Sequence, residues 1–278
     1  MTTLVSVIIP TFNEEDTIGD CLESILHQTY KDIELIVVDD GSSDKTLKIV
    51  SKTKAKVFTQ KHQGPGVARN LGAKNAKGKI LVFVDSDMTF DHNFIRDLVK
   101  PITNQHEVGT FSKNEFVKND KDPWSVCWNI NKNLPPHRMI PENYPKEAPV
   151  FRAILKSEFD KVNGFETNGE YTDDWSLSEK LSKKSVLAAG AIYFHVNPAS
   201  ITEIYKQARW IGKNKFIIGN TRRKVRSLLI YNPISSIIVG MLKSIMYKNP
   251  RFFVFKQIYN FAVFTSVLKS FASEGKYK

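Results

Sequence analysis

The sequence predicts an α/β protein with an open, mostly parallel sheet and helices on both of its faces, followed by amphipathic C-terminal helices. Three runs, at residues 4–10, 33–38 and 79–84, are almost continuously apolar and rich in β-branched residues, which is typical of strands buried on both faces. Segments with apolar residues at helical spacing separate these runs. Because strands that alternate with helices usually pair in parallel, the pattern favours a doubly wound sheet.

The first helix is expected directly after the first strand. Asn13 is the expected N-cap, because acidic residues occupy positions 14–16 and the N-terminus of a helix favours negative charge. Apolar residues then recur at helical spacing over 18–26, which gives the helix one apolar face.

The same pattern continues to the end of the fourth strand. Turn residues and capping residues mark each joint. The expected elements are a strand at 33–38, a turn at Gly41 and Ser42, a helix beginning at Lys45 and capped by Asp44, a strand at 56–59, a Gly/Pro loop at 63–66, a helix at 67–76 and a strand at 79–84.

The character of the sequence changes over residues 112–149, which are rich in Pro, Asn, Lys and Trp and show little periodicity. We expect a long loop here, and loops of this length in compact domains are usually functional or mobile. Order is expected to resume with a strand at 150–155, a turn at Asn163 and Gly164 and a helix over 175–183.

Apolar segments punctuated by Lys and Arg follow residue 222. The longest uncharged stretch, 227–242, has 16 residues and contains Asn232 and Pro233, whereas a membrane-spanning helix needs roughly 20 residues. This pattern is typical of amphipathic helices that lie among lipid headgroups. A helix pair packed on the domain or on a second subunit is the alternative.

Positive charge is concentrated in the same region. The net charge is +11, but residues 204–278 carry 15 Lys and Arg with one acidic residue, while the first 203 residues carry 25 basic and 28 acidic residues. A basic tail on a slightly acidic body indicates a local anionic partner such as a membrane surface, and not nucleic acid.

The cysteines and the N-terminus predict a cytosolic location. Cys21 and Cys127 are too few for a disulfide framework and lack metal-binding spacing, so we expect both to be packing residues. The first residues have no basic segment ahead of a long apolar run, unlike a secretory signal peptide.

Carboxylates follow two of the predicted strands. Asp40 follows the strand at 33–38, and Asp85 and Asp87 follow the strand at 79–84, so they are expected at one edge of the sheet, where such folds bind ligands. Carboxylates placed together repel unless they hold a cation or a ligand. The pair at Asp120 and Asp122 has the same spacing but lies in a Lys-rich stretch, and we expect a solvated loop there.

The loop after the first strand excludes one class of enzyme. A dinucleotide site needs Gly-x-Gly-x-x-Gly at this position, where the chain has PTFNE over residues 10–14. This argues against an NAD- or FAD-dependent oxidoreductase. The loop Gly64–Gly66 could instead approach a phosphate, with Arg69 as a cationic partner.

The blocks VSVIIPTFNEED, VVDDGSSDKT and GVARNLGAKNAKGKILVFVDSDM together resemble the nucleotide-binding half of family 2 glycosyltransferases, which have the GT-A fold, a Rossmann-like open sheet. The resemblance covers about the first 90 residues. It implies a nucleotide-sugar site with Pro10, Thr11, Asn13 and Glu14 around the nucleoside, Asp40 at the base, Arg69 near the diphosphate, Asp85 near the ribose with Ser86 beside it, and Asp87 on the metal ion.

The second half resembles the family less closely. FRAILKSEFDKVNGF and YTDDWSLSEKL are similar to its strand-turn and acidic-helix blocks, although Asp173 and Ser176 replace the usual Glu and Asp. The resemblance implies that Asp174 is the catalytic base, with Asp173 beside it at the acceptor or diphosphate; the alternative is that both cap the next helix. It also implies a metal or diphosphate role for His195, and an acceptor or phosphate role for Arg209 and Trp210.

The expected protein is therefore an inverting glycosyltransferase that uses Mg²⁺ or Mn²⁺ and a UDP- or GDP-sugar. Its expected parts are a nucleotide-sugar half at 1–111, an acceptor half at 112–221 and membrane-associated helices at 222–278. The acceptor is expected to be a glycan hydroxyl or a polyprenyl-linked group at the cytosolic face of a membrane. The alternatives are a nucleotidyltransferase or a non-catalytic binding module that uses the basic tail, and the sequence does not indicate an oligomeric state.

Overall fold

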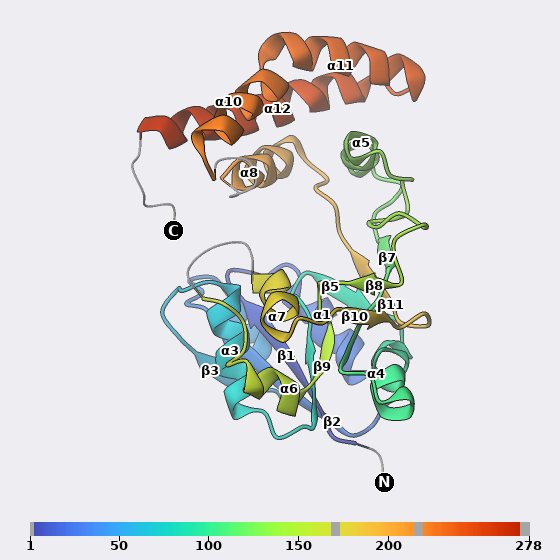
Figure 1. Cartoon of the computed structure of the whole chain (residues 1–278). Coiled ribbons are helices and arrows are strands. Elements are labelled where there is room, and N and C mark those ends of the chain that lie inside the picture. The colour runs from blue at the N-terminus through green and yellow to red at the C-terminus, as the bar shows by residue number, and fades with distance from the viewer. Residues whose placement is uncertain (1–2, 168–172, 214–218, 273–278) are drawn as a thin grey trace. The chain divides into compact units, whose positions relative to one another are not determined.

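The computed structural model describes residues 3–167, 173–213 and 219–272, and the chain forms two compact units (Figure 1). The first unit consists of Met1–Phe116 and Ile140–His195, and the second of Val117–Met139 and Val196–Lys278. Each unit is thus built from two separate stretches of chain. The functional division expected at residues 111 and 221 remains a prediction, because these units follow compactness alone.

An eight-stranded sheet forms the centre of the first unit. Its order is β3-β2-β1-β4-β9-β6-β10-β8, with β1 parallel to both β2 and β4, and β9 antiparallel between β4 and β6. The strands are β1 (Val5–Thr11), β2 (Ile33–Asp39), β3 (Lys56–Thr59), β4 (Ile80–Phe83), β6 (Gly109–Phe111), β8 (Glu147–Ala148), β9 (Ala153–Leu155) and β10 (Ser185–Leu187). The predicted mostly parallel sheet is confirmed.

Helices cover both faces of this sheet, as expected. Along β1, Val5, Val7 and Ile9 pack in one apolar cluster with α1 and α4, while Ile8 packs in another with α3, α6 and α7. Successive residues of a strand point to opposite faces, so a strand buried on both faces must be apolar throughout. The helices are α1 (Ile18–Leu26), α2 (Thr46–Val50), α3 (Pro65–Asn75), α4 (Phe94–Gln105), α6 (Lys156–Lys161) and α7 (Asp173–Leu181).

A smaller sheet carries part of the site. It has the order β5-β11-β7, formed by β5 (Met88–Phe90), β11 (Ile192–His195) and β7 (Asn114–Val117). In the antiparallel pairing of β11 with β5, His195 lies opposite Met88. This register brings His195 next to the carboxylates that follow β4.

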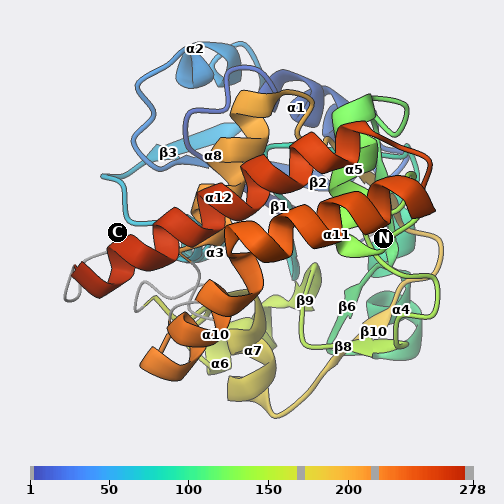
Figure 2. The same ribbon diagram turned by 90° about the horizontal axis from the view of Figure 1, so that it is seen from above.

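The second unit is helical. Its core contains Trp128, whose ring meets Phe255 and Tyr259 edge to face at centroid distances of 6.0 and 5.7 Å. In Figure 2, α11 and α12 lie side by side. The helices are α5 (Pro123–Lys132), α8 (Ile201–Ile211), α10 (Thr221–Tyr231), α11 (Pro233–Met246) and α12 (Arg251–Ala272), so the predicted C-terminal helices are confirmed.

The prediction of a long loop over 112–149 is wrong, because this region contains β7, α5 and β8. The prediction that Asp120 and Asp122 lie in a solvated loop is also wrong for Asp122. Asp122 is the N-cap of α5 and accepts hydrogen bonds from the backbone N–H groups of Trp124 and Ser125, with Pro123 in the first turn. An Asp-Pro pair of this kind is a helix-start signal.

Two further capping predictions need correction. Asn13 does not cap α1, which begins at Ile18. Asn13 has a left-handed backbone with φ of 55°, and its side chain accepts a hydrogen bond from the backbone N–H of Ser43, so it links two loops. The second helix begins one residue later than expected, at Thr46, although Asp44 still accepts the N–H of that residue.

Among the described helices, none is long and apolar enough by itself to cross a membrane. The consecutive helices α10 and α11 pass this test of length and composition as a pair, with a bend of 51° between them.

Candidate active site

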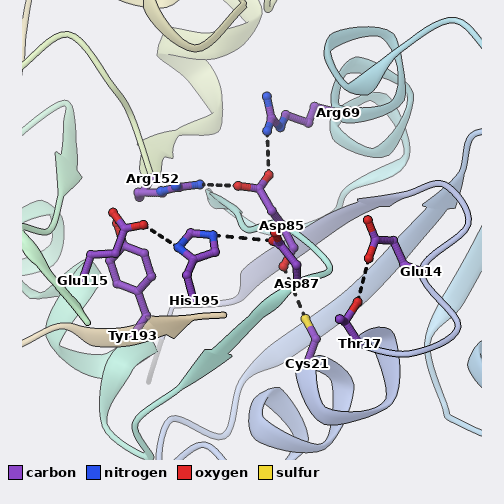
Figure 3. A network of polar contacts seen from close by, with 10 residues as sticks. All are labelled: Glu14, Thr17, Cys21, Arg69, Asp85, Asp87, Glu115, Arg152, Tyr193 and His195. Atoms are coloured by element: carbon purple, nitrogen blue, oxygen red, sulfur yellow. Dashed lines mark hydrogen bonds and ion pairs between the residues drawn. The ribbon is translucent and has the colours of Figure 1, made fainter. Parts of the chain in front are cut away.

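Asp85 follows β4 and is held between two arginines (Figure 3). Its Oδ1 lies 2.6 Å from Nη2 of Arg69, and its Oδ2 lies 3.1 Å from Nη1 of Arg152. Burial favours the neutral acid, but the two guanidinium charges outweigh it and hold the pKa of Asp85 well below its usual value. Asp85 is therefore a carboxylate that brings two positive charges together, that of the buried Arg69 and that of the partly buried Arg152.

Arg69 was predicted from sequence, and Arg152 was not. Arg69 is supplied by α3, whereas Arg152 immediately precedes β9. The backbone N–H of Phe83 donates to the carbonyl of Arg152 at 2.9 Å, so β9 places this side chain beside the end of β4. The sequence does not indicate that Arg152 lies near Asp85, because β9 and β4 are about 70 residues apart and pair only in the folded sheet.

The structure brings Asp87 and His195 together, while their expected role at a metal ion remains a prediction. Nε2 of His195 is 3.5 Å from Oδ1 of Asp87, and Nδ1 of His195 contacts the carboxylate of Glu115. Glu115 also accepts a hydrogen bond from the hydroxyl of Tyr193 at 2.9 Å. Burial lowers the pKa of His195, but the two carboxylates outweigh it and raise that pKa to about 10. The two carboxylates therefore favour the protonated form of the ring.

Glu14 adds a further acidic group near the end of β4. Burial raises the pKa of Glu14, and the charges of Asp87 and Asp85 raise it further, against the hydrogen bond that Thr17 donates to it at 2.7 Å. Cys21 lies in the same region, and burial raises the pKa of its thiol. Cys21 is buried and free, in agreement with its predicted packing role.

Asp40 organises the loop before α3. Its carboxylate accepts hydrogen bonds from the side chain of Gln60 and from the backbone N–H groups of Gln63 and Gly64, at 2.7 to 2.9 Å, and contacts His62. Only 3% of Asp40 is exposed. Its predicted contact with a nucleobase remains a prediction, while its role in ordering residues 60–64 is visible.

An aromatic pair lies beside this loop. The rings of Phe12 and His62 are stacked, with centroids 4.1 Å apart, and both side chains are exposed to a large extent. Neither residue was assigned to the site from sequence. The sequence signal that was available is an aromatic residue between Thr11 and Asn13, which were both predicted to border the site.

The other predicted residues differ in how much the structure says of them. Pro10, Thr11 and Ser86 are buried at the ends of β1 and β4. The side chains of Asp173 and Asp174, at the start of α7, lie outside the described residues. Two more predicted residues lie in the second unit on α8, where the guanidinium of Arg209 is 5.8 Å from the ring centroid of Tyr205 and 49% of Trp210 is exposed.

The carboxylates after β4 fit a divalent ion whose coordination is completed by the substrate. In the described part of the chain, no three His, Cys, Asp or Glu side chains are grouped to hold a metal ion. Asp87 is 48% exposed and has an oxygen to offer, whereas both oxygens of Asp85 face arginines. Mg²⁺ is commonly held by one or two carboxylates with substrate phosphates and water, so a single available carboxylate suits it.

Residues 6–162, more than half of the chain, match the family model described as glycosyl transferase family 2. The chain belongs to this family. The matched range includes Arg69, Asp85, Asp87, Glu115 and Arg152, so most of the polar network described above lies within the glycosyl transferase family 2 segment. Membership in this family favours glycosyl transfer over the two alternatives, a nucleotidyltransferase and a non-catalytic binding module.

Known proteins are similar to this family 2 chain in sequence and in structure. A glycosyltransferase of Rickettsia felis is 45% identical over 92 residues, which is 32% of this chain and 15% of the relative, so the chain matches a minor part of that protein's length. The structure of S. aureus TarS in complex with UDP has a TM-score of 0.57 at 20% identity, covering 99% of this chain and 93% of that one.

A second solved structure is similar to the same extent. The mannosyltransferase PcManGT from Pyrobaculum calidifontis, in complex with GDP-Man and Mn²⁺, has a TM-score of 0.56 at 18% identity, covering 98% of this chain and 75% of that one. At these identities the likeness establishes the shared GT-A fold alone.

Proposed function

We propose that this enzyme transfers a sugar from a nucleoside diphosphate to an acceptor, with inversion at the anomeric carbon. The observation that carries the proposal is the pair of arginines on Asp85 beside the exposed carboxylate of Asp87, all at the end of β4. Open α/β sheets bind ligands at the carboxyl ends of their strands. Positive charge next to an available carboxylate suits a diphosphate that arrives with a divalent ion.

The nucleoside is proposed to bind where β1 and β2 end. The stacked pair of Phe12 and His62 offers a flat, exposed surface that suits the face of a uracil or guanine ring. Pro10, Thr11, Asn13 and Glu14 are proposed to border this pocket, with Asp85 and Ser86 towards the ribose. TarS and PcManGT, which bind UDP and GDP-Man, support a UDP- or GDP-sugar as the donor.

The diphosphate is proposed to lie against Arg69 and Arg152, where their charges favour an anionic group. Asp87 would hold Mg²⁺ or Mn²⁺, and His195 could join it after losing its proton. Such an ion neutralises negative charge that develops on the leaving diphosphate. PcManGT, which was solved with Mn²⁺, supports the metal requirement.

Asp174 is proposed as the base that takes the proton from an acceptor hydroxyl, on the face of the sugar opposite the diphosphate. Attack from that face inverts the anomeric configuration. If the acceptor is a polyprenyl phosphate, it is already ionised and Asp174 serves to position it. Asp173, Arg209 and Trp210 are proposed to contact the acceptor or the diphosphate. We place the enzyme at the cytosolic face of a membrane as a peripheral protein, on the basis of its basic C-terminal helices.

The proposal can be tested by titrating the full chain with UDP and with GDP in a calorimeter, with Mg²⁺ or Mn²⁺ present. We expect one nucleotide to bind in a metal-dependent manner. Asp87→Ala should weaken that binding about tenfold or more, because the ion loses its protein ligand. Asp120→Ala, which removes an aspartate with the same spacing outside the site, is the matched control and should bind as the wild type does.

Binding of neither nucleotide would refute the proposal, as would equal effects of the two substitutions. Once the donor sugar is found by screening UDP- and GDP-sugars for hydrolysis, turnover of Asp174→Asn on the acceptor tests the base. Full activity of that variant would exclude Asp174 as the base.

A further inference from the structure

One side of α11 is an exposed apolar stripe. Its members recur every three or four residues, so they lie on one face of the helix. The most exposed are Ile245 at 77% and Ile234 and Met246 at 71% each. The complete stripe is Ile234, Ile237, Ile238, Met241, Leu242, Ile245 and Met246.

The opposite side of α11 packs against protein. The hydroxyl of Ser236 donates to Gln257 of α12 at 2.7 Å, and a Cβ built on Gly240 would lie 3.1 Å from the ring of Phe253. Lys243 also points to this side, where its Nζ donates to the carbonyl of Ile130 at 2.7 Å. The helix is thus anchored along one side and apolar along the other.

Neighbouring helices add to the apolar surface. Of the 22 exposed large hydrophobic residues in the described part of the chain, 15 lie between residues 225 and 271, which is about a sixth of the chain. Isolated exposed apolar residues are normal, but a concentration of this kind marks an interaction site. We call the stripe on α11 together with Val225, Leu229 and Ile230 of α10 the apolar face.

The charge around the apolar face has one sign. Residues 219–272 contain nine Lys and Arg and no Asp or Glu. Arg222 and Arg226 on α10 are exposed, as are Lys248 and Arg251 after α11. A partner for this surface must therefore combine apolar groups with negative charge.

This charge pattern argues against a second copy of the chain on the apolar face. A symmetric dimer would bring two surfaces together that carry basic residues and no acidic ones, and like charges in an interface oppose association. A bilayer with anionic lipids meets both demands, because acyl chains accept the apolar side chains and headgroups face the basic ones.

We propose that α11 lies in the plane of an anionic lipid surface, with its apolar stripe at the acyl boundary and the exposed arginines of α10 against the headgroups. A helix with one apolar side and one side packed on protein suits this orientation. This proposal adds to the membrane association proposed above by naming the protein surface that binds, the apolar face, and the charge of the lipid, which is negative. It does not depend on the assignments of the sugar-transfer site.

The test is sedimentation of the full chain with vesicles of phosphatidylcholine alone and of phosphatidylcholine mixed with phosphatidylglycerol. We expect binding to the mixed vesicles, weakened by salt. Ile238→Gln with Ile245→Gln should lower the partition coefficient by about tenfold for each side chain removed from the acyl boundary. Arg222→Gln with Arg226→Gln should lower it about fivefold for each charge.

Leu26→Gln with Val57→Gln is the matched control, since both residues are exposed hydrophobics of the first unit. The control should bind vesicles as the wild type does, and all variants should keep nucleotide binding. Absence of vesicle binding by the wild type, or unchanged binding by the isoleucine variant, would overturn the inference. If the wild type forms a dimer and does not bind vesicles, and the isoleucine variant is a monomer, the apolar face would be a self-association surface instead. Vesicle binding without nucleotide binding would contradict the proposed activity alone.

Discussion

Gly72 of α3 is the point where a single methyl group should disturb both the fold and the site. A Cβ on Gly72 would lie 2.5 Å from Cγ2 of Ile8 and 3.2 Å from Cγ2 of Val38. Both partners are buried β-branched residues of the central strands and have no room to turn away. Gly72→Ala should therefore push α3 off the sheet, and with it Arg69, which lies three residues earlier.

The size of the effect follows from two opposing terms. Overpacking a tight core costs about 1 to 3 kcal/mol, and a clash this close belongs at the upper end. Replacing a helical glycine with alanine contributes about 0.5 to 1 kcal/mol in the other direction. The net loss should be about 2 to 2.5 kcal/mol, which lowers the melting temperature of a domain of this size by about 4 to 10 °C.

Thermal unfolding followed by circular dichroism or calorimetry measures this loss, and nucleotide titration measures the displacement of Arg69. Gly19→Ala in α1 is the matched control. Its new Cβ would meet only Cγ2 of Ile49, at an ordinary 3.8 Å, so this variant should be as stable as the wild type or slightly more stable. The reasoning fails if Gly72→Ala melts at or above the wild-type temperature while the control behaves as expected.

Two further predictions concern the helical unit. Burial and the charge of Lys243 lower the pKa of Lys256 from 10.5 to about 8, so the unfolded chain binds more protons between these values and stability should rise with pH across that window. Comparison of urea unfolding at pH 7.5 and 9.5 should show this rise, about 1 to 2 kcal/mol, in the wild type but not in Lys256→Met. Asn129→Ala should cost about 2 to 4 kcal/mol in the same assay, because the Asn129 amide reaches the carbonyls of Pro135 and Arg138 and is itself paired with Asn197. A loss below 1 kcal/mol would contradict that account.

The central strands could be predicted because burial on both faces leaves a continuous apolar run in the sequence. The same reasoning placed Asp85 and Asp87 at the carboxyl end of β4, since strand ends follow directly from strand positions. Arg69 could be proposed because it lies about one turn into the helix that the Gly64, Pro65 and Gly66 stretch begins. These inferences need only local sequence and the parallel pairing of the strands.

Arg152 and Glu115 could not be predicted in this way. Their positions depend on which strands become neighbours: β9 joins β4, and β7 joins β11. That order is settled by packing over the whole sheet, and nothing in the residues around either side chain encodes it.

Helix α5 was missed for a different reason. Its buried residues include Ser125 and Asn129, so the apolar spacing that reveals a helix is broken. Asn129 is buried without penalty because its amide is hydrogen-bonded to backbone carbonyls. The capping pair before the helix was the better guide.

Each of the two units contains two separate stretches of the chain, which limits the use of truncated variants. Helix α5 belongs to the first half of the sequence, yet its Trp128 is covered by aromatic residues of α12 near the end of the chain. A shortened chain that stops before α12 would leave that tryptophan bare and prone to aggregate. Loss of activity in such a truncated chain would therefore be a result of misfolding. Point substitutions at exposed positions test the role of the helical unit without this complication.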